Sequence, residues 1–248
     1  MIILSILFFI TAILYSSVGF GGGSTYLALL LIWDVPYLIF PIIALLCNII
    51  VVSGNSFNYI RAGNHNFKLL LPFLIGSVPL AFLGGTLKID KDIFEILLFF
   101  VLSIAGFLLL INNKSYENNN SIVKRLNFII SLIIGSVLGL ISGIVGIGGG
   151  IFLSPILFLL KAEKPKIIVT TASLFILINS ISGILGQLTK ENILTELSNY
   201  IPLFICVFIG GLLGNYLNLK IFTSRVLAII TSLLVIFVSI RMGIKIFF

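Results

Sequence analysis

The chain has 248 residues, of which 59% are hydrophobic and 9% charged, and its mean hydropathy is +1.27. An ordinary soluble domain carries roughly 25% charged residues, so this composition excludes a soluble globular protein and indicates an integral membrane protein. The formal charge of +7 does not argue for a nucleic-acid partner, because basic loops beside apolar spans are expected of any membrane protein that follows the positive-inside rule.

Taken in chain order, the apolar runs predict about eight hydrophobic segments. A helix needs about 20 apolar residues to cross a bilayer core, and six runs satisfy this without a break. They are residues 36–60, 69–87, 93–111, 167–188, 200–219 and 226–247. Two more runs, 2–33 and 126–160, are too long for one straight crossing, and each holds a cluster of glycines. We therefore expect an all-α integral membrane protein.

The glycine cluster VGFGGGS at residues 18–24 returns 127 positions later as VGIGGGI at residues 145–151. Neither copy completes the G-x-G-x-x-G spacing of a dinucleotide site, and no lysine is placed to make a P-loop. Glycine permits the positive φ angles of a sharp turn and lets a ligand approach the backbone. A non-helical backbone at membrane depth is tolerated only inside protein or beside a wet cavity. The two clusters therefore predict helix breaks that line a cavity.

Other features recur at an offset of 129 or 130. The matching positions are Pro72 and Pro202, Gly84 and Gly214, and Ser53-Gly54 and Ser182-Gly183. Such internal duplication is typical of transporters, in which the substrate site lies between the repeats. We therefore predict one transmembrane transporter domain over residues 1–248, built from two homologous four-segment repeats, 1–111 and 122–248, joined by a linker at 112–121.

The basic residues favour one of two topologies. If each glycine-broken run crosses the membrane once, the two sides carry eight and seven Lys and Arg residues, which is no bias. If each run enters and turns back at its glycines, ten gather on one side against five, as the positive-inside rule expects. The ten are Arg61, Lys68, Lys114, Lys124, Arg125, Lys161, Lys164, Lys166, Lys220 and Arg225. We therefore favour inverted repeats, each opening with a re-entrant helix, with both termini outside and the linker in the cytoplasm.

Each break is predicted to be an anion site, because the half-helix that follows it, 24–33 or 151–160, directs free N–H groups and a positive dipole end at the break. The candidate substrate-binding residues are Gly19, Gly21, Gly22, Gly23, Ser24, Gly146, Gly148, Gly149, Gly150, Thr171 and Asn179. Thr171 either caps its helix or faces the site. Close packing is the alternative role for small residues. We assign packing to Gly135, Gly139 and Gly143, to Ser77, Ala81 and Gly85, and to Gly210 and Gly214.

Two polar helix faces are open to two interpretations. One carries Asn48, Asn55 and Ser56, and the other carries Asn179, Ser182 and Gly186. Each face either lines a hydrophilic path or forms hydrogen bonds with neighbouring helices. No Asp, Glu, Lys or Arg falls clearly in the middle of a span, so the sequence does not support coupling to protons or sodium.

The sequence offers little chemistry beyond binding. His65 is the single histidine, and no carboxylates cluster, so neither a metal site nor an acid–base pair has support. Cys47 and Cys206 each lie in an apolar segment and provide no disulfide framework. We therefore predict no enzyme activity, no cofactor and no metal.

The chain resembles the TauE/SafE family of sulfite and organosulfonate exporters. The stretches that carry the resemblance are SVGFGGGSTYLALL at 17–30, SGIVGIGGGIFLSPILFLL at 142–160 and TTASLFILINSISGILG at 170–186. The family pattern places a proline after the glycines, and Pro155 matches it, whereas Ala28 stands in the first copy. The resemblance implies a plasma-membrane, multi-pass transporter of small anions, often sulfur-containing ones, that uses no cofactor.

The function predicted is transport of a small anion, such as sulfite, an organosulfonate or a related sulfur-containing or carboxylate anion, by alternating access around the paired breaks. A passive anion channel with the same glycine-lined site is the alternative, and a membrane scaffold or enzyme is the less favoured one. The expected partners are the anion and the lipid bilayer, with no nucleic acid. Whether the chain forms a homo-oligomer stays open.

Overall fold

The computed structural model describes residues 1–17, 19–111, 126–190 and 197–217, together with scattered positions between 229 and 244. Within these residues every regular element is a helix, so the prediction of an all-α protein is confirmed. The helices are α1 (Ile2–Ser16), α2 (Gly23–Ile32), η1 (Tyr37–Ile39), α3 (Phe40–Arg61), α4 (Phe67–Thr86), α5 (Lys91–Ile111), α6 (Phe128–Val145), α7 (Gly150–Leu159), α8 (Pro165–Gln187), η3 (Ser198–Tyr200) and α10 (Ile201–Leu217). The predicted linker at 112–121 and most of the predicted segment 226–247 lie outside the described residues.

Helix boundaries follow from local signals in the sequence. Asn66 and Asn127 cap α4 and α6, because their side-chain oxygens accept hydrogen bonds from Leu69 N at 3.2 Å and from Ile129 N at 2.8 Å. Pro165 opens α8 at the first helical position, where its missing N–H costs nothing. Charged side chains lie only near the ends of the described helices. These signals explain why the predicted segment boundaries lie within a few residues of the observed ones.

The length and apolarity of the helices and the apolar outer surface of the bundle show that this is a multi-pass membrane protein. In the described part of the chain, five helical stretches are long and apolar enough to span a bilayer: Tyr37–Arg61, Phe67–Thr86, Phe128–Val145, Pro165–Gln187 and Ser198–Tyr216. Large apolar side chains are exposed along the outer faces, among them Ile6, Ile10, Leu71, Leu83, Ile133, Val137, Ile205 and Leu212. A soluble monomer rarely exposes contiguous apolar surface of this extent, whereas lipid tails solvate it.

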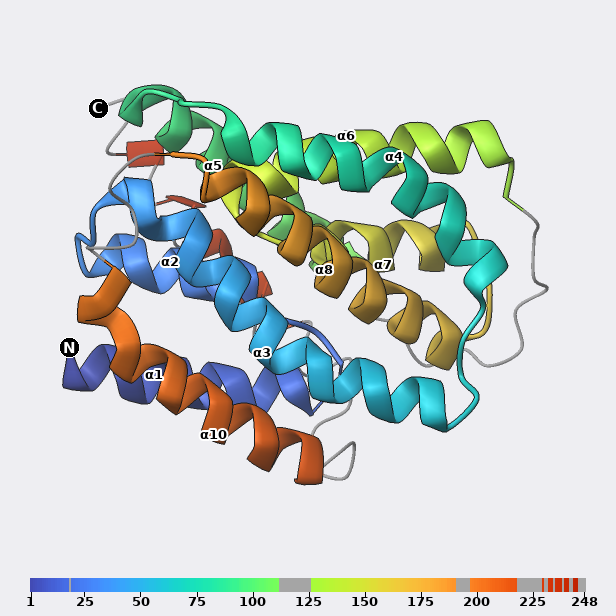
Figure 1. The fold of residues 1–248 in the computed structure, drawn as a ribbon, viewed down its shortest axis with the longest axis horizontal. Helices are drawn as coiled ribbons and strands as arrows, with labels where there is room; N and C mark the ends of the chain where they lie inside the picture. The colour runs from blue at the N-terminus through green and yellow to red at the C-terminus, as the bar shows by residue number, and fades with distance from the viewer. Residues whose placement is uncertain are drawn as a thin grey trace.

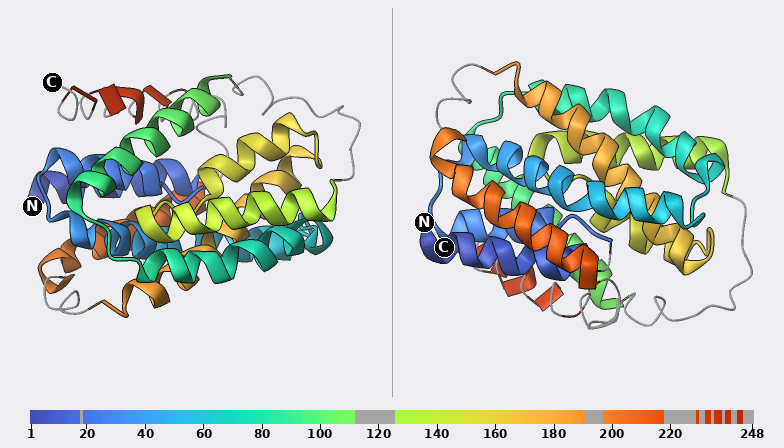
Figure 2. Two further views of the ribbon diagram at one scale, coloured as in Figure 1. Left: turned by 90° about the horizontal axis from the view of Figure 1, so that it is seen from above. Right: turned by 60° about the horizontal axis from the view of Figure 1, so that its bottom comes forward.

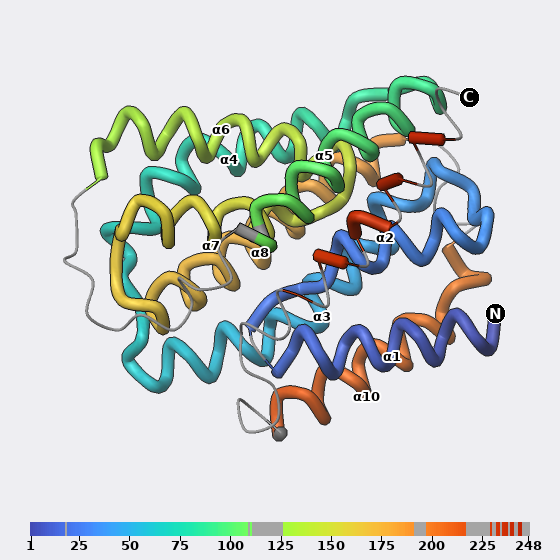
Figure 3. The backbone as a smooth tube through the Cα atoms, turned by 180° about the vertical axis from the view of Figure 1, so that it is seen from behind, coloured from blue at the N-terminus to red at the C-terminus, as the bar shows by residue number. Residues whose placement is uncertain are grey.

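Helices α1 and α2 form a hairpin, because α2 turns back toward the end of the bundle at which α1 begins (Figures 1 and 3). We call this end, where Met1 lies, the amino-terminal end. The Tyr15 and Thr25 hydroxyls are 2.7 Å apart, and the Phe8 and Tyr26 rings pack at 4.7 Å between centroids, so side chains join the two limbs. Helices α6 and α7 form a second hairpin, which enters from the opposite end (Figure 3).

The first limb of each hairpin packs against a helix from the other half of the chain. Helix α1 lies beside α10, and α6 lies beside α4 (Figure 2). Small residues allow both contacts: a Cβ atom built on Gly210 would lie 2.6 Å from the Phe9 carbonyl oxygen, and one on Gly143 would lie 2.8 Å from Gly85 N. Gly135 likewise packs directly against the Phe73 backbone, and Gly139 packs against the Ser77 backbone. The packing role predicted for these small-residue sets is confirmed.

Helices α3 and α8 pack against each other in the interior, and each carries one of the two polar faces. The Ser56 and Ser173 hydroxyls meet there, 3.1 Å apart. Ser182 donates a hydrogen bond to the Val78 carbonyl oxygen of α4 at 2.6 Å. Part of each polar face therefore serves to join helices.

Candidate functional site

The first break lies between α1, which ends at Ser16, and α2, which begins at Gly23. Gly19 has φ +87° and Gly22, the N-cap of α2, has φ +83°. Residues with a Cβ rarely adopt this left-handed conformation, so the turn requires glycine at both positions. The Ser16 hydroxyl donates to the Gly211 carbonyl oxygen at 2.7 Å and ties the end of α1 to α10. The first break is therefore a defined turn held against a neighbouring helix.

The second break repeats this geometry. Gly146 ends α6 with φ +91°, and Gly149, the N-cap of α7, has φ +75°. These two residues occupy the places of Gly19 and Gly22. Gly148 also has a positive φ, +80°, whereas Gly21 at the matching place does not. The two breaks thus share the turns that open and close them and differ in between.

The two breaks meet in the interior of the bundle around one side chain, Asn48 of α3. Its Nδ2 donates a hydrogen bond to the Ile147 carbonyl oxygen at 3.1 Å. A Cβ atom on Gly23 would lie 2.7 Å from that same carbonyl oxygen, and one on Gly148 would lie 2.8 Å from Asn48 Nδ2. Gly21 also packs against the Asn48 side chain. We call Gly21, Gly23, Asn48, Ile147 and Gly148 the glycine junction.

Several buried polar atoms without a hydrogen-bond partner belong to this junction or to residues next to it along the chain. Within the described residues they include Asn48 Oδ1, Ser24 Oγ, Asn179 Oδ1 and Ser180 Oγ. All four side chains are buried, and Ser180 Oγ would lie 3.1 Å from a Cβ atom on Gly148. Buried polar atoms in native proteins are nearly always bonded, so each exception requires an explanation. This group is suited to hydrogen-bonding a small polar ligand.

The helix ends give the junction its electrostatic character. Helices α2 and α7 begin at Gly23 and Gly150, and neither is capped by a side chain. The first N–H groups of a helix lack partners within the helix, and together they act as roughly half a positive charge. In the described residues no charged side chain belongs to the junction. The positive electrostatic character of the junction therefore comes from backbone dipoles.

The eleven predicted site residues are all buried, but they do not form one cluster. Gly21, Gly23 and Gly148 belong to the glycine junction. Gly19 instead packs against the Tyr59 hydroxyl, and Gly146 packs against the Pro41 backbone. The outer glycines of the two breaks therefore contact opposite ends of α3.

The two site residues predicted on α8 behave differently from the glycines. The Thr171 hydroxyl donates to the Ile167 carbonyl oxygen at 2.8 Å, one turn back, which excludes capping, one of the two alternatives for this residue. Asn179 Nδ2 donates to the Phe175 carbonyl oxygen of its own helix at 2.9 Å, and its Oδ1 has no partner. Of the two, only Asn179 has a polar atom without a hydrogen-bond partner, and that atom, Oδ1, is a hydrogen-bond acceptor.

Sequence reasoning left Asn48, Ser180 and Tyr59 out of the predicted site. Asn48 was recognised only as part of a polar helix face. The available signal was its place among apolar neighbours, ALLCNIIVV at residues 44–52, since polar residues inside a span mark functional positions. Ser180 and Tyr59 carry no comparable signal, because serine and tyrosine are common in apolar helices.

An all-helical, multi-pass bundle whose two broken helices meet in the interior has the architecture of a membrane transporter. The chain belongs to the family described as sulfite exporter TauE/SafE, which it matches over residues 4–242. This confirms the resemblance seen in the glycine motifs.

Two relatives extend this assignment over almost the whole chain. A probable membrane transporter protein, y4hK of Sinorhizobium fredii, is 26% identical over 236 residues, covering 93% of each chain. YunE of Bacillus subtilis, also described as a probable membrane transporter protein, is 22% identical over 263 residues, covering 95% of this chain and 94% of its own. No solved structure matches at a significant level.

Proposed function

We propose that this protein is a secondary transporter that moves a small anion, such as sulfite, an organosulfonate or a small carboxylate, across the cell membrane by alternating access. The observation that carries the proposal is the glycine junction. Two uncapped half-helices begin there, near the buried Ser24 and Ser180 hydroxyls, which have no partner in the described residues and can donate hydrogen bonds to an anion. Broken transporter helices bind anionic groups in this way. The family description, sulfite exporter, agrees with an anionic substrate.

In this proposal the chain consists of two inverted repeats, 1–111 and 122–248, each opening with a re-entrant hairpin. Helices α2 and α7 support it, because each has ten residues and starts just after a left-handed glycine. At 1.5 Å per residue each extends about 15 Å, half of a bilayer core. The reciprocal pairs α1–α10 and α4–α6 also support it, because a twofold operation that exchanges the halves exchanges these pairs.

The distribution of charge supports the same topology. Asn66, between α3 and α4, donates a hydrogen bond to Glu163, between α7 and α8, at 3.1 Å. The connections at this end and the helix ends beside them carry five basic residues: Arg61, Lys68, Lys161, Lys164 and Lys166. The amino-terminal end carries fewer: Lys88 and Lys190, which line one pocket there, and Lys91 at the start of α5. This is the separation expected if the end with five basic residues faces the cytoplasm.

Two contacts would serve as gates on either side of the bound anion. Gly19 with Tyr59 lies toward the end of α3 that Arg61 occupies, and Gly146 with Pro41 lies at the end where α3 begins. Opening one contact while the other stays closed exposes the junction to one side only. The small-residue contacts of α1 with α10 and of α4 with α6 let the two halves rock, because backbones in direct contact can slide without moving side chains aside.

The proposal predicts saturable anion flux in proteoliposomes that contain the purified protein. The screen covers sulfite, thiosulfate, alkanesulfonates and small carboxylates, followed by counterflow with the best anion. We expect counterflow, meaning transient uptake of labelled anion that is driven by an outward gradient of unlabelled anion. Flux without counterflow would indicate an anion channel and not a transporter. No flux of any anion, together with turnover of a substrate by the purified protein, would indicate that the protein is an enzyme.

Re-entry of the hairpins gives a separate prediction. In a variant with Cys47 and Cys206 replaced by serine, Ile2→Cys and Leu38→Cys should react with a membrane-impermeant thiol reagent from the same side of the membrane. Both native residues are exposed and flank the first hairpin. Phe128→Cys and Leu160→Cys, flanking the second hairpin, should share the other side. Labelling of Ile2→Cys and Leu38→Cys from opposite sides would contradict re-entry.

A further inference from the structure

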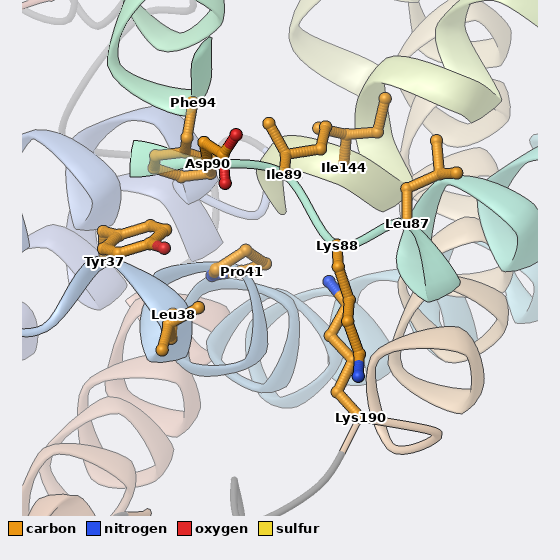
Figure 4. Close-up of a pocket in the computed structure, with 10 residues that line it drawn as sticks. All are labelled: Tyr37, Leu38, Pro41, Leu87, Lys88, Ile89, Asp90, Phe94, Ile144 and Lys190. Carbon is orange, nitrogen blue, oxygen red and sulfur yellow. The ribbon is translucent and has the colours of Figure 1, made fainter. Parts of the chain in front are cut away.

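A cavity of about 330 Å³ opens at the amino-terminal end of the bundle (Figure 4). It lies between the start of α3, the connection from α4 to α5, and Lys190 just after α8. Two lysines line it, Lys88 from the α4–α5 connection and Lys190 from just beyond α8. The cavity is large enough for a small anion with several waters, since a water occupies about 30 Å³ in the liquid.

The Lys190 ammonium is held in place by a buried relay. Lys190 Nζ donates to Gln187 Oε1 at 2.8 Å, and Gln187 Nε2 donates to the Gly143 carbonyl oxygen of α6 at 2.8 Å. Gln187 is fully buried. Lys190 is itself half-buried, whereas Lys88 is exposed at the mouth of the cavity. The relay positions one positive charge at the cavity wall and links it to α6, three residues before Gly146.

The two lysines lack a compensating negative charge in the part of the chain that is described. The ion pair found there joins Lys91 to Glu95 and involves neither lysine. Asp90 also lines the cavity, but its carboxylate lies on the Phe94 side, apart from both lysines (Figure 4). Burial lowers the pKa of Lys190 to about 8, and the Lys88 charge adds to this effect. An oxyanion between two ammonium groups would offset the repulsion and accept charge-assisted hydrogen bonds from both.

The cavity adjoins the closed contact over the glycine junction. Pro41 and Ile144 form part of its wall, and the Pro41 backbone packs directly on Gly146. An anion in the cavity is therefore separated from the second break by the Gly146–Pro41 contact. We propose that Lys88 and Lys190 form a binding site for a small oxyanion at the amino-terminal mouth of the transport path. This inference rests on the proposed function in taking the bound oxyanion to be the transported one.

The site is tested by protection of the lysines from acylation in the purified protein, which requires no transport. An amine-reactive ester is applied with and without sulfate, thiosulfate, methanesulfonate or acetate, and modification of each lysine is measured by mass spectrometry. At least one anion should slow acylation of Lys88 and Lys190 severalfold. Lys91 is the control, because it lies at the same end and is largely exposed but does not line this cavity. Equal protection of all three lysines, or of none, would overturn the site.

The site should bind an anion more weakly as the pH rises. Lys190 is charged below about pH 8 and loses its proton as the pH rises through that value. The other ionisable groups of the cavity are Lys88, Asp90 and Tyr37. The probe is methanesulfonate, because its charge is constant in this range. The methanesulfonate concentration that protects half of Lys88 from acylation should rise between pH 7 and pH 9. It should stay constant in Lys190→Arg, which keeps its charge, and a rise of the same size there would remove Lys190 from the site.

Flux separates this site from the proposed function. Lys88→Gln and Lys190→Gln should each raise the KM for the transported anion roughly tenfold, the loss expected for one charge-assisted hydrogen bond, and Lys91→Gln should leave it unchanged. Unchanged KM in both lysine variants, with flux intact, would overturn the mouth site and leave the transporter standing. Specific protection of Lys88 and Lys190 by an anion that shows no flux would establish the site and count against the transport proposal.

Discussion

Replacing Asn48 by alanine is expected to lower anion flux by about a hundredfold while leaving most of the protein folded. The substitution removes the donor to the Ile147 carbonyl oxygen and the side-chain amide at the glycine junction. Losing one partner of a buried hydrogen bond costs about 1–3 kcal/mol, which a bundle of this size can bear. Flux falls further because the anion also loses the Asn48 side-chain amide as a hydrogen-bond donor. The measurements are initial flux in proteoliposomes and the thermal midpoint of the purified protein.

Asn58→Ala is the matched control for this prediction. Asn58 lies on the same helix, and its Nδ2 donates to Asn215 Oδ1 of α10 at 2.9 Å. It lies away from the junction and is only half-buried, so its replacement also removes one interhelical hydrogen bond, at a smaller cost in stability, and should leave flux within about twofold. Asn48→Asp sharpens the test, because the side chain keeps its size and gains a negative charge that repels an anion. Normal flux in Asn48→Asp would remove Asn48 from the binding site.

Alanine at Gly22 or Gly149 is expected to abolish flux and to destabilise the protein more than alanine at Gly63. All three residues have positive φ, +83°, +75° and +73°, so each alanine carries a conformational cost of about 1–2 kcal/mol. At Gly63 the new methyl group meets nothing within 4 Å. At Gly22 it meets the Tyr15 ring at 3.2 Å, and at Gly149 the Phe175 ring at 2.8 Å. The measurements are the thermal midpoint and proteoliposome flux.

The expected order of destabilisation is Gly149→Ala, then Gly22→Ala, then Gly63→Ala. Gly63→Ala reports the conformational cost by itself, because it shares the backbone conformation and lacks the contact. If Gly149→Ala and Gly63→Ala shift the thermal midpoint equally, the Phe175 ring moves aside and the contact is not tight. If Gly22→Ala and Gly149→Ala reach normal flux once folded, the turns serve folding and not the passage of the anion.

Features that depend on near neighbours in sequence were predictable. The helices begin close to the predicted positions because Pro165, Asn66 and Asn127 act within one turn of themselves. The glycine breaks were visible for the same reason, since positive φ is a property of the residue at that place. The packing glycines were visible because G-x-x-x-G spacing places small residues on one helix face.

Contacts between distant residues were not predictable in this way. For Thr171 the sequence left capping and facing the site as alternatives, because a threonine near a helix start has the same spacing whether it caps or bonds one turn back, as it does to Ile167. The joining of the two breaks through Asn48 and Ile147, 99 residues apart, has no local signature. Neither does the meeting of Lys88 with Lys190 in one cavity.

The sequence by itself determined that this protein is an all-helical membrane protein of the TauE/SafE family with two matching glycine breaks, because apolar length, glycine clusters and motif spacing are properties of the chain. Only the tertiary structure decided which groups surround those breaks. Asn48 reaches Ile147, and the outer glycines reach Tyr59 and Pro41, because the packing of α3 between the two hairpins brings them together. Such contacts depend on the crossing of helices in space, and spacing along the chain does not encode it.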